Sequence, residues 1–133
     1  RAHVYPDAYQ QLKNWHESNV PLYVYSSGSI QAQKLFFGYS EFGDMTPFFQ
    51  GYFDTTSGAK QDAESYRRIV AAIGLPAGEV IFLSDIVGEL DAAKQAGLQT
   101  CWLVRPEDVV ADQARIRASD HPVADTFSDI RLS

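Results

Sequence analysis

Cysteine is nearly absent from this sequence, and its scarcity bears on the compartment in which the chain works. The 133 residues contain one cysteine, Cys101, which excludes an internal disulfide bond. We therefore expect a reducing compartment, with the cytoplasm as the default. Cys101 falls within a predicted buried strand, where a thiol packs as a small apolar group and is chemically inert.

Long apolar runs are missing as well. No stretch approaches the roughly 20 residues of a membrane-spanning helix, and no signal peptide opens the chain. The sequence begins with Arg1 rather than Met, and the residues after it resemble the approach to a helix. We therefore expect the chain to be a piece of a longer protein.

Basic residues are outnumbered by acidic ones. The sequence has 11 Lys and Arg against 17 Asp and Glu, a formal net charge of -6. A nucleic-acid partner needs a basic face that displaces counterions, so this balance argues against one. It argues equally against docking on an anionic membrane. A phosphate ligand is still allowed, because a local site can be positive on an acidic protein.

Length and composition suit one globular core. A single domain typically takes about 100–200 residues, and the hydrophobic content of 45% is ordinary for one. We therefore expect residues 1–133 to belong to a single domain. Residue patterns predict one helix that begins at Pro6 and ends near 19–21, and another between Lys60 and Gly74. Further helices are predicted at 30–37, 90–96 and 108–117. Apolar runs predict buried strands at 22–25, 80–83 and 100–104, with a short strand near 51–53.

Strands that alternate with helices through short links predict an α/β fold, with a parallel sheet covered by helices in three layers. In such sheets a ligand binds beyond the carboxyl ends of the strands. The residues that directly follow the apolar runs are therefore the candidate site, at 26–29, 84–85 and 105–106.

The first candidate segment suits an anion. Ser26 and Ser27 supply hydroxyl groups, and Gly28 lets the backbone come close to a ligand. The helix that follows offers backbone N–H groups at its N-terminus, and together these groups make a phosphate site. The alternative is that Ser27 or Ser29 only caps that helix.

The candidate site also needs charged side chains that can bind a phosphoryl group and its metal. The sequence offers Lys60, Asp85 and Glu89. Lys60 precedes a helix, from which its ammonium could act as a fixed positive charge on the transferring group. Asp85 ends a strand, and Glu89 follows one helical turn later, so carboxylate oxygens are placed to bind Mg²⁺. The alternatives are a solvated surface lysine and a helix N-cap at Asp85 with Glu89 in the first turn.

Four strings carry a resemblance to a known family. They are HVYPD, YVYSSGSIQAQKLFFGYS, GYFDTTSGAKQDAESYRRI and IFLSDIVGELDAA, which begin at His3, Tyr23, Gly51 and Ile81. An apolar strand followed by Ser, a lone Lys before a helix and an apolar strand followed by Asp resemble three motifs of the haloacid dehalogenase superfamily. The four strings are similar to its enolase-phosphatase branch. The resemblance covers His3 to about Pro106.

The resemblance implies a Rossmann-like fold and an enzyme. Enolase-phosphatases of methionine salvage use Mg²⁺ to convert 2,3-diketo-5-methylthiopentyl 1-phosphate to acireductone and phosphate. By motif match, Ser26, Ser27 and Gly28 would bind the substrate phosphate. Lys60 would neutralise the phosphate as a catalytic residue, Asp85 would hold the metal, and Glu89 matches the second acid of that motif. The partner would be a small phosphorylated diketone, and the full-length enzyme would be a monomer.

One part of the family pattern is not found. The nucleophilic aspartate and a further metal-binding acid form an Asp-x-Asp or Asp-x-Glu motif on the first strand, and a helical cap follows it. Nothing before Ser26 fits, since Asp7 follows a proline and heads a helix. The resemblance therefore implies that residues 1–133 are the C-terminal part of a core domain without that strand and cap. Such a fragment would be inactive alone, and its exposed strand edges would favour self-association. Two alternatives stay open, a phosphatase for another small phosphate ester and a non-catalytic phosphate-binding fragment.

Overall fold

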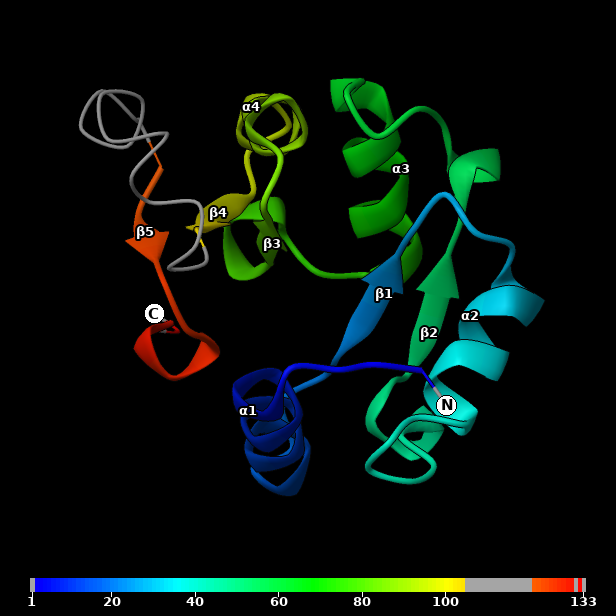
Figure 1. Ribbon diagram of the computed structural model, residues 1–133. Helices are drawn as coiled ribbons and strands as arrows, with labels where there is room; N and C mark the ends of the chain where they lie inside the picture. The colour runs from blue at the N-terminus through cyan, green and yellow to red at the C-terminus, as the bar shows by residue number, and fades with distance from the viewer. Residues whose placement is uncertain (1, 105–120, 131, 133) are drawn as a thin grey trace. The chain divides into compact units, whose positions relative to one another are not determined.

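The computed structural model describes residues 2–104, 121–130 and 132 (Figure 1). The chain divides into two compact units, Arg1–Gly58 and Ala59–Ser133, and each is described by itself. The expectation of a single domain stays a prediction. Within the described residues, no helix is both long enough and apolar enough to cross a membrane.

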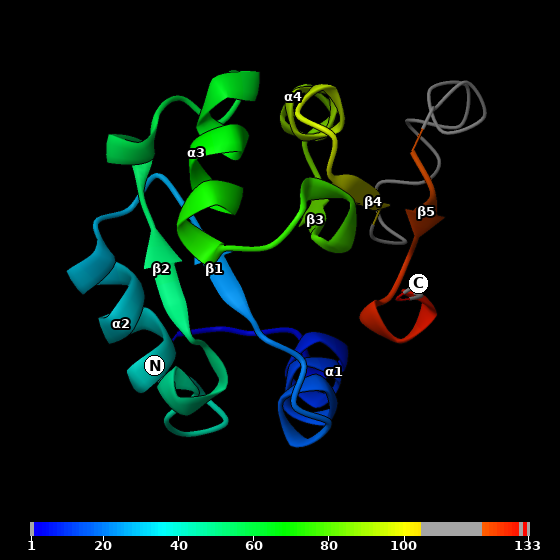
Figure 2. The ribbon, with the colours of Figure 1, turned by 180° about the vertical axis from the view of Figure 1, so that it is seen from behind.

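The first unit has two helices and a two-stranded parallel sheet. Its elements are α1 (Pro6–Glu17), β1 (Tyr23–Tyr25), α2 (Ile30–Gly38) and β2 (Gly51–Phe53). Strand β1 pairs with β2, and Tyr23 lies opposite Gly51 in the register. Helix α2 packs along β2, as Figure 1 and the view from behind in Figure 2 both show. This arrangement places the end of β1 and the start of α2 close to the end of β2.

Local chemistry explains where α1 begins and ends. Pro6 occupies the first helical turn, where its missing N–H costs nothing, and Asp7 complements the helix dipole. Ala8 and Trp15 are buried on one face. Asn19 follows the helix with a φ of 63°, a left-handed conformation that asparagine tolerates better than most residues. The predicted helix is therefore confirmed.

The second unit holds a three-stranded parallel sheet. Its elements are α3 (Ala63–Ile73), β3 (Ile81–Ser84), α4 (Val87–Gln95), β4 (Gln99–Leu103) and β5 (Val123–Ala124), and the strand order is β3-β4-β5. Helix α4 packs on β3 and β4, and α3 packs against α4. The sequence patterns did not predict β5, because a strand of two residues has no periodicity. The predicted helix at 108–117 and the candidate residues at 105–106 lie outside the described residues.

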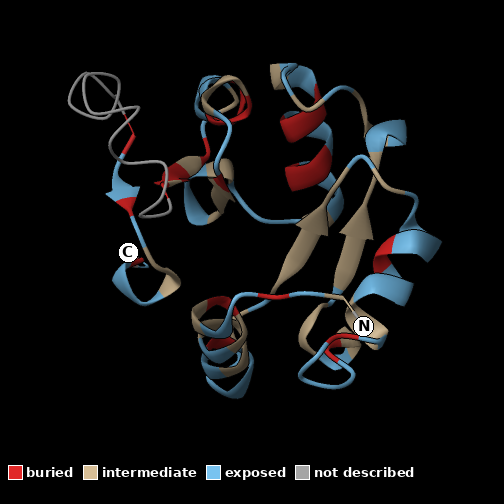
Figure 3. Cartoon of the chain, in the orientation of Figure 1, coloured by how far each residue is buried: buried red, intermediate tan, exposed pale blue. Residues whose placement is uncertain are grey.

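Helix α3 has clear signals at both ends. The Asp62 carboxylate accepts a hydrogen bond from the Glu64 N–H at 3.0 Å and so caps the N-terminus. Gly74 ends the helix with a φ of +84°, which glycine adopts without strain. Between them the stripe of Tyr66, Ile69 and Val70 is buried, and Figure 3 marks these turns in red.

The core of the second unit lies between α4 and its sheet. Leu90 of α4 is fully buried against Trp102 and Val104, and the partly buried Phe82 and Val87 complete the cluster. All three residues of β1 in the first unit are only half-buried, as are three of the four residues of β3 in the second. The parallel strands predicted at 22–25 and 80–83 are therefore confirmed, but they are less buried than the apolar runs indicated.

Candidate functional site

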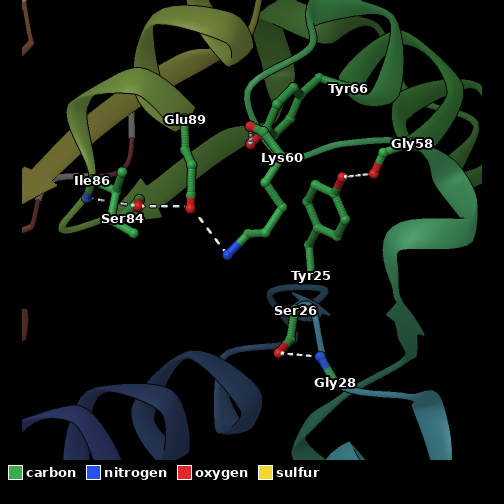
Figure 4. Close-up of polar contacts among 9 residues, drawn as sticks. All are labelled: Tyr25, Ser26, Gly28, Gly58, Lys60, Tyr66, Ser84, Ile86 and Glu89. Carbon is green, nitrogen blue, oxygen red and sulfur yellow. Dashed lines mark hydrogen bonds and ion pairs between the residues drawn. The ribbon is translucent and has the colours of Figure 1, made fainter.

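The loop after β1 is folded back on itself. The Ser26 N–H donates to the carbonyl of Phe53 at the end of β2 at 3.1 Å. The Ser26 hydroxyl accepts a hydrogen bond from the Gly28 N–H at 3.2 Å (Figure 4). Ser26 is half-buried, whereas Ser27 is exposed. The loop is therefore held to the sheet at Ser26, and the Ser27 hydroxyl is left accessible.

Ser29 caps the helix that follows this loop. Its hydroxyl accepts a hydrogen bond from the Ala32 N–H at 3.0 Å. The capping role that the sequence left open between Ser27 and Ser29 thus belongs to Ser29. The first N–H groups of a helix have no intrahelical acceptor. With Ala32 satisfied by the cap, the N–H groups of Ile30 and Gln31 at this helix end are suited to an anion.

Lys60 is held through its ammonium group. The Nζ atom lies 3.1 Å from Oε1 of Glu89, and the side chains are 26% and 7% exposed (Figure 4). Lys60 is therefore not a freely solvated surface lysine, the alternative raised by the sequence. The ion pair places a positive charge at a defined position near the end of β3.

Buried hydroxyl groups also anchor the backbone around Lys60. The Tyr66 hydroxyl donates to the Lys60 carbonyl at 2.6 Å, and the Ser65 hydroxyl donates to the Ala59 carbonyl at 2.7 Å. Tyr66 is 1% exposed, and its ring packs edge-on against Phe82 of β3. In the sequence, Tyr66 is one position of the helix predicted between Lys60 and Gly74, and no local pattern indicates that its hydroxyl binds the Lys60 carbonyl.

The backbone of Gly58, the last residue of the first unit, is anchored as well. Within the first unit, the Tyr25 hydroxyl donates to the Gly58 carbonyl at 2.6 Å. Three residues after the end of β2, Thr56 donates hydrogen bonds from its hydroxyl and its N–H to the Asp54 carboxylate. These bonds, the side-chain one first, lower the pKa of Asp54 and keep it ionised. Hydrogen bonds thus hold the segment between β2 and the end of the first unit at Asp54 and at Gly58.

Ser84 connects Glu89 to the turn that carries Asp85. Its hydroxyl donates to Glu89 Oε1 at 3.0 Å and accepts from the Ile86 N–H at 3.0 Å. Ile86 is the N-cap of α4 and has no side-chain cap, so the alternative of Asp85 as the N-cap is wrong. The Asp85 backbone carbonyl accepts from the Trp102 indole at 3.2 Å, while the residue is exposed. The Asp85 carboxylate is therefore displayed on a fixed backbone.

The donor set fits part of a magnesium site. Mg²⁺ is usually bound by one or two carboxylates, with water and substrate phosphate as further ligands. Asp85 supplies one such carboxylate, exposed at the carboxyl end of β3. In the parts of the chain that the structure describes, no group of three or more His, Cys, Asp or Glu could hold a metal ion. Because Glu89 Oε1 already contacts both Ser84 and Lys60, its metal-binding role stays a prediction.

The predicted site residues thus fall into two sets. Ser26, Ser27 and Gly28 belong to the first unit, and Lys60, Asp85 and Glu89 belong to the second. Within the second unit, the structure brings Lys60 and Glu89 into contact and links Glu89 to the Asp85 turn through Ser84. The convergence of both sets on one ligand stays a prediction.

A second polar chain in the second unit has a structural function. The Thr100 hydroxyl contacts Nδ1 of His121 at 2.6 Å, and Nε2 of His121 contacts the Asp91 carboxylate at 2.7 Å. Thr100 and His121 are 7% and 5% exposed, so a ligand has no access to the hydroxyl. The chain ties the segment before β5 to β4 and α4. Burial also raises the pKa of Cys101, in keeping with its predicted inertness.

Comparisons with known proteins support the family expected from the sequence. The model of the haloacid dehalogenase-like hydrolases matches residues 1–97. Proteins named Enolase-phosphatase E1 are 53% identical to this chain in Stenotrophomonas maltophilia (strain K279a) and 55% identical in Alcanivorax borkumensis, over 98% and 99% of its length. The chain spans only 57% and 55% of the lengths of those two relatives.

Solved structures support the fold. The UTR4 protein from Saccharomyces cerevisiae has a TM-score of 0.84 and 35% sequence identity, with 98% of this chain and 58% of that chain covered. The L-2-haloacid dehalogenase from Xanthobacter autotrophicus is 17% identical and shares the fold, with a TM-score of 0.72 over 94% of this chain and 58% of its own. The predicted α/β class with parallel strands and the resemblance to enolase-phosphatases are thus confirmed. The chain belongs to the haloacid dehalogenase-like hydrolases.

Proposed function

We propose that this protein is a Mg²⁺-dependent phosphatase of the enolase-phosphatase type. Its substrate would be 2,3-diketo-5-methylthiopentyl 1-phosphate, and its products acireductone and phosphate in methionine salvage. The observation that carries the proposal is the Lys60 ammonium, paired with Glu89 at 3.1 Å beside the turn that displays Asp85. The names and identities of the curated relatives support the same activity.

Each residue has a distinct task in this proposal. The hydroxyl groups of Ser26 and Ser27, with the N–H groups at the start of α2, bind the phosphate. Lys60 neutralises charge that develops on the transferring phosphoryl group, and its fixed position means that little reorganisation is needed during reaction. Asp85 would hold Mg²⁺, which when bound supplies further charge neutralisation.

Glu89 has two compatible tasks. Its carboxylate orients Lys60, as the ion pair indicates. A contribution to the metal, predicted from the motif, would have to use lone pairs that Ser84 and Lys60 leave available. Both tasks require an ionised carboxylate, so a neutral replacement impairs either one.

The chain as given supplies binding groups and charge but is proposed to be an incomplete catalytic unit. An aspartyl-phosphate route needs a carboxylate in line with the phosphorus, and neither Lys60 nor Mg²⁺ can replace an attacking atom. We therefore propose that residues 1–133 bind phosphate and do not turn over substrate alone. The activity, the monomeric state and the cytoplasmic location are proposed for the intact protein.

A substrate panel tests the proposed function. Phosphate release by the intact protein is measured with Mg²⁺ on the diketo phosphate and on sugar and nucleotide phosphates. The diketo phosphate should have the highest kcat/KM, and acireductone should form at the same rate as phosphate. A sugar or nucleotide phosphate that is turned over faster would instead identify a different phosphatase of the same family.

A further inference from the structure

Gln33 is a buried polar side chain on α2 that the proposed reaction leaves unused. It is 5% exposed, whereas its neighbours Gln31, Ala32 and Lys34 are exposed. An apolar residue is the usual choice at a buried helix position, because an amide must be stripped of water to be buried there. The contacts of this glutamine therefore need an explanation.

The amide nitrogen of Gln33 binds two carbonyl groups. Nε2 donates to the Gly28 carbonyl at 3.0 Å and to the Phe53 carbonyl at 2.9 Å. Both partners only accept hydrogen bonds, so the nitrogen, not the oxygen, must face them. The Phe53 carbonyl also accepts from the Ser26 N–H. Gln33 thus ties the loop after β1 to the end of β2.

The amide oxygen of Gln33 makes no stabilising hydrogen bond in the described structure. In the described structure Oε1 is buried and has no hydrogen-bond partner. An unsatisfied buried acceptor lowers stability. The two donor bonds are therefore the physical reason for a glutamine here, and a methionine of similar shape would remove both the bonds and the unsatisfied oxygen.

The bond to Gly28 also sets the direction of the next N–H group. The described chain has no cis peptide bonds, and in a planar trans peptide the C=O and the following N–H point in opposite directions. When Gln33 draws the Gly28 carbonyl toward α2, the Ser29 N–H points the other way. The partial negative charge of the carbonyl is turned inward, and the N–H donor is turned outward.

We propose that Gln33 is a positioning residue of the phosphate site, which it organises through the Gly28–Ser29 peptide. This inference rests on the proposed function, because it takes the loop of Ser26 to Ser29 as the phosphate site. Gln33 does not touch the phosphate. It holds the peptide in the orientation that an anion prefers, so the ligand does not have to reorganise the loop on binding.

Phosphate titration of the ¹⁵N-labelled chain tests the inference. Inorganic phosphate is added, and the amide resonances of residues 26–30 give the dissociation constant for the wild type, Gln33→Met and the matched control Gln10→Met. Gln10 is exposed on α1, so the control makes the same change of residue type away from the phosphate site. We expect binding about tenfold weaker in Gln33→Met, as for the loss of one net hydrogen bond, and unchanged binding in Gln10→Met.

A second measurement uses the wild type alone, so it tests the inference even if the Gln33→Met variant does not fold. Binding and tethering are coupled, so phosphate should slow the exchange of the Gln33 side-chain amide protons with solvent. Unchanged exchange at saturating phosphate would overturn the inference. Equal phosphate affinity in Gln33→Met and Gln10→Met would also overturn it, while the proposed function stands. A wild type whose resonances at 26–30 do not respond to phosphate would overturn the phosphate site itself, and the inference with it.

Discussion

Glu89 Oε1 lies 3.1 Å from the Lys60 ammonium and accepts a hydrogen bond from the Ser84 hydroxyl at 3.0 Å. One oxygen thus joins a lysine that precedes α3 to a serine that ends β3. The Glu89 side chain is 7% exposed, so its charge is largely removed from water and depends on these two partners. The position of the Lys60 charge is consequently a property of the folded second unit.

Replacement of Lys60 should abolish most of the catalytic rate. In the intact protein, Lys60→Ala should lower kcat for phosphate release by about 10²–10³, the usual value of a preorganised charge-stabilising group. Steady-state phosphate release with Mg²⁺ measures the change. Lys94→Ala, which alters an exposed lysine of α4, serves as the control. A Lys60→Ala rate close to that of the control would remove Lys60 from the catalytic site.

The ion pair should also be visible in stability. Lys60→Met leaves the buried Glu89 charge with Ser84 alone, and we expect the free energy of unfolding to fall by about 1–3 kcal/mol. Glu89→Gln in the same chain removes that charge and should recover part of the loss. Urea unfolding of both single variants and the double variant gives the coupling energy. Strictly additive changes would contradict an energetic link between the two side chains.

Asp85 should control the magnesium requirement. Asp85→Asn keeps the shape of the side chain but removes the charge that attracts a hard cation. In the intact protein the Mg²⁺ concentration for half-maximal phosphate release should rise at least about tenfold, the low end of the effect of mutations at metal-site residues. Asp91→Asn tests whether any exposed acid of the second unit has this effect. Full activity of Asp85→Asn at the wild-type Mg²⁺ requirement would exclude the metal role.

The Tyr66 hydroxyl should contribute to stability through the Lys60 carbonyl. Tyr66→Phe keeps the ring that packs on Phe82 and removes a single hydrogen bond. The expected loss is about 0.5–1.5 kcal/mol of unfolding free energy, measured by urea titration. Tyr39→Phe provides the comparison, because Tyr39 is 70% exposed. If both variants lose the same stability, the hydroxyl does not anchor the backbone at Lys60.

Cys101 should be unreactive in the folded chain and should affect stability at high pH. Burial raises the pKa of its thiol, so the thiolate is disfavoured relative to the unfolded chain. A raised pKa contributes stability that is present below the unfolded pKa, roughly 8.5, and is lost as pH rises through the folded pKa. Reaction with a disulfide reagent should be slow in buffer and fast in urea. Above about pH 9, wild-type stability should fall more steeply than that of Cys101→Ala.

Local patterns in the sequence predicted most of the elements. The Pro6 start and the break near 19–21 match α1, and the short strand near 51–53 matches β2. These predictions succeeded because capping, helix breaking and apolar periodicity act over a few neighbouring residues. The strand β5 escaped prediction, since its two residues owe their conformation to pairing with β4.

The family and the candidate residue types could be predicted from the residues alone: hydroxyl groups at 26 and 27, an ammonium at 60 and carboxylates at 85 and 89. Which of these groups touch became clear in the folded chain. The pairing of Lys60 with Glu89, the bridge through Ser84 and the tether from Gln33 to Phe53 all join residues from different elements. A hydrogen bond depends on distance and direction in space, and spacing along the chain sets neither until the strands and helices have packed.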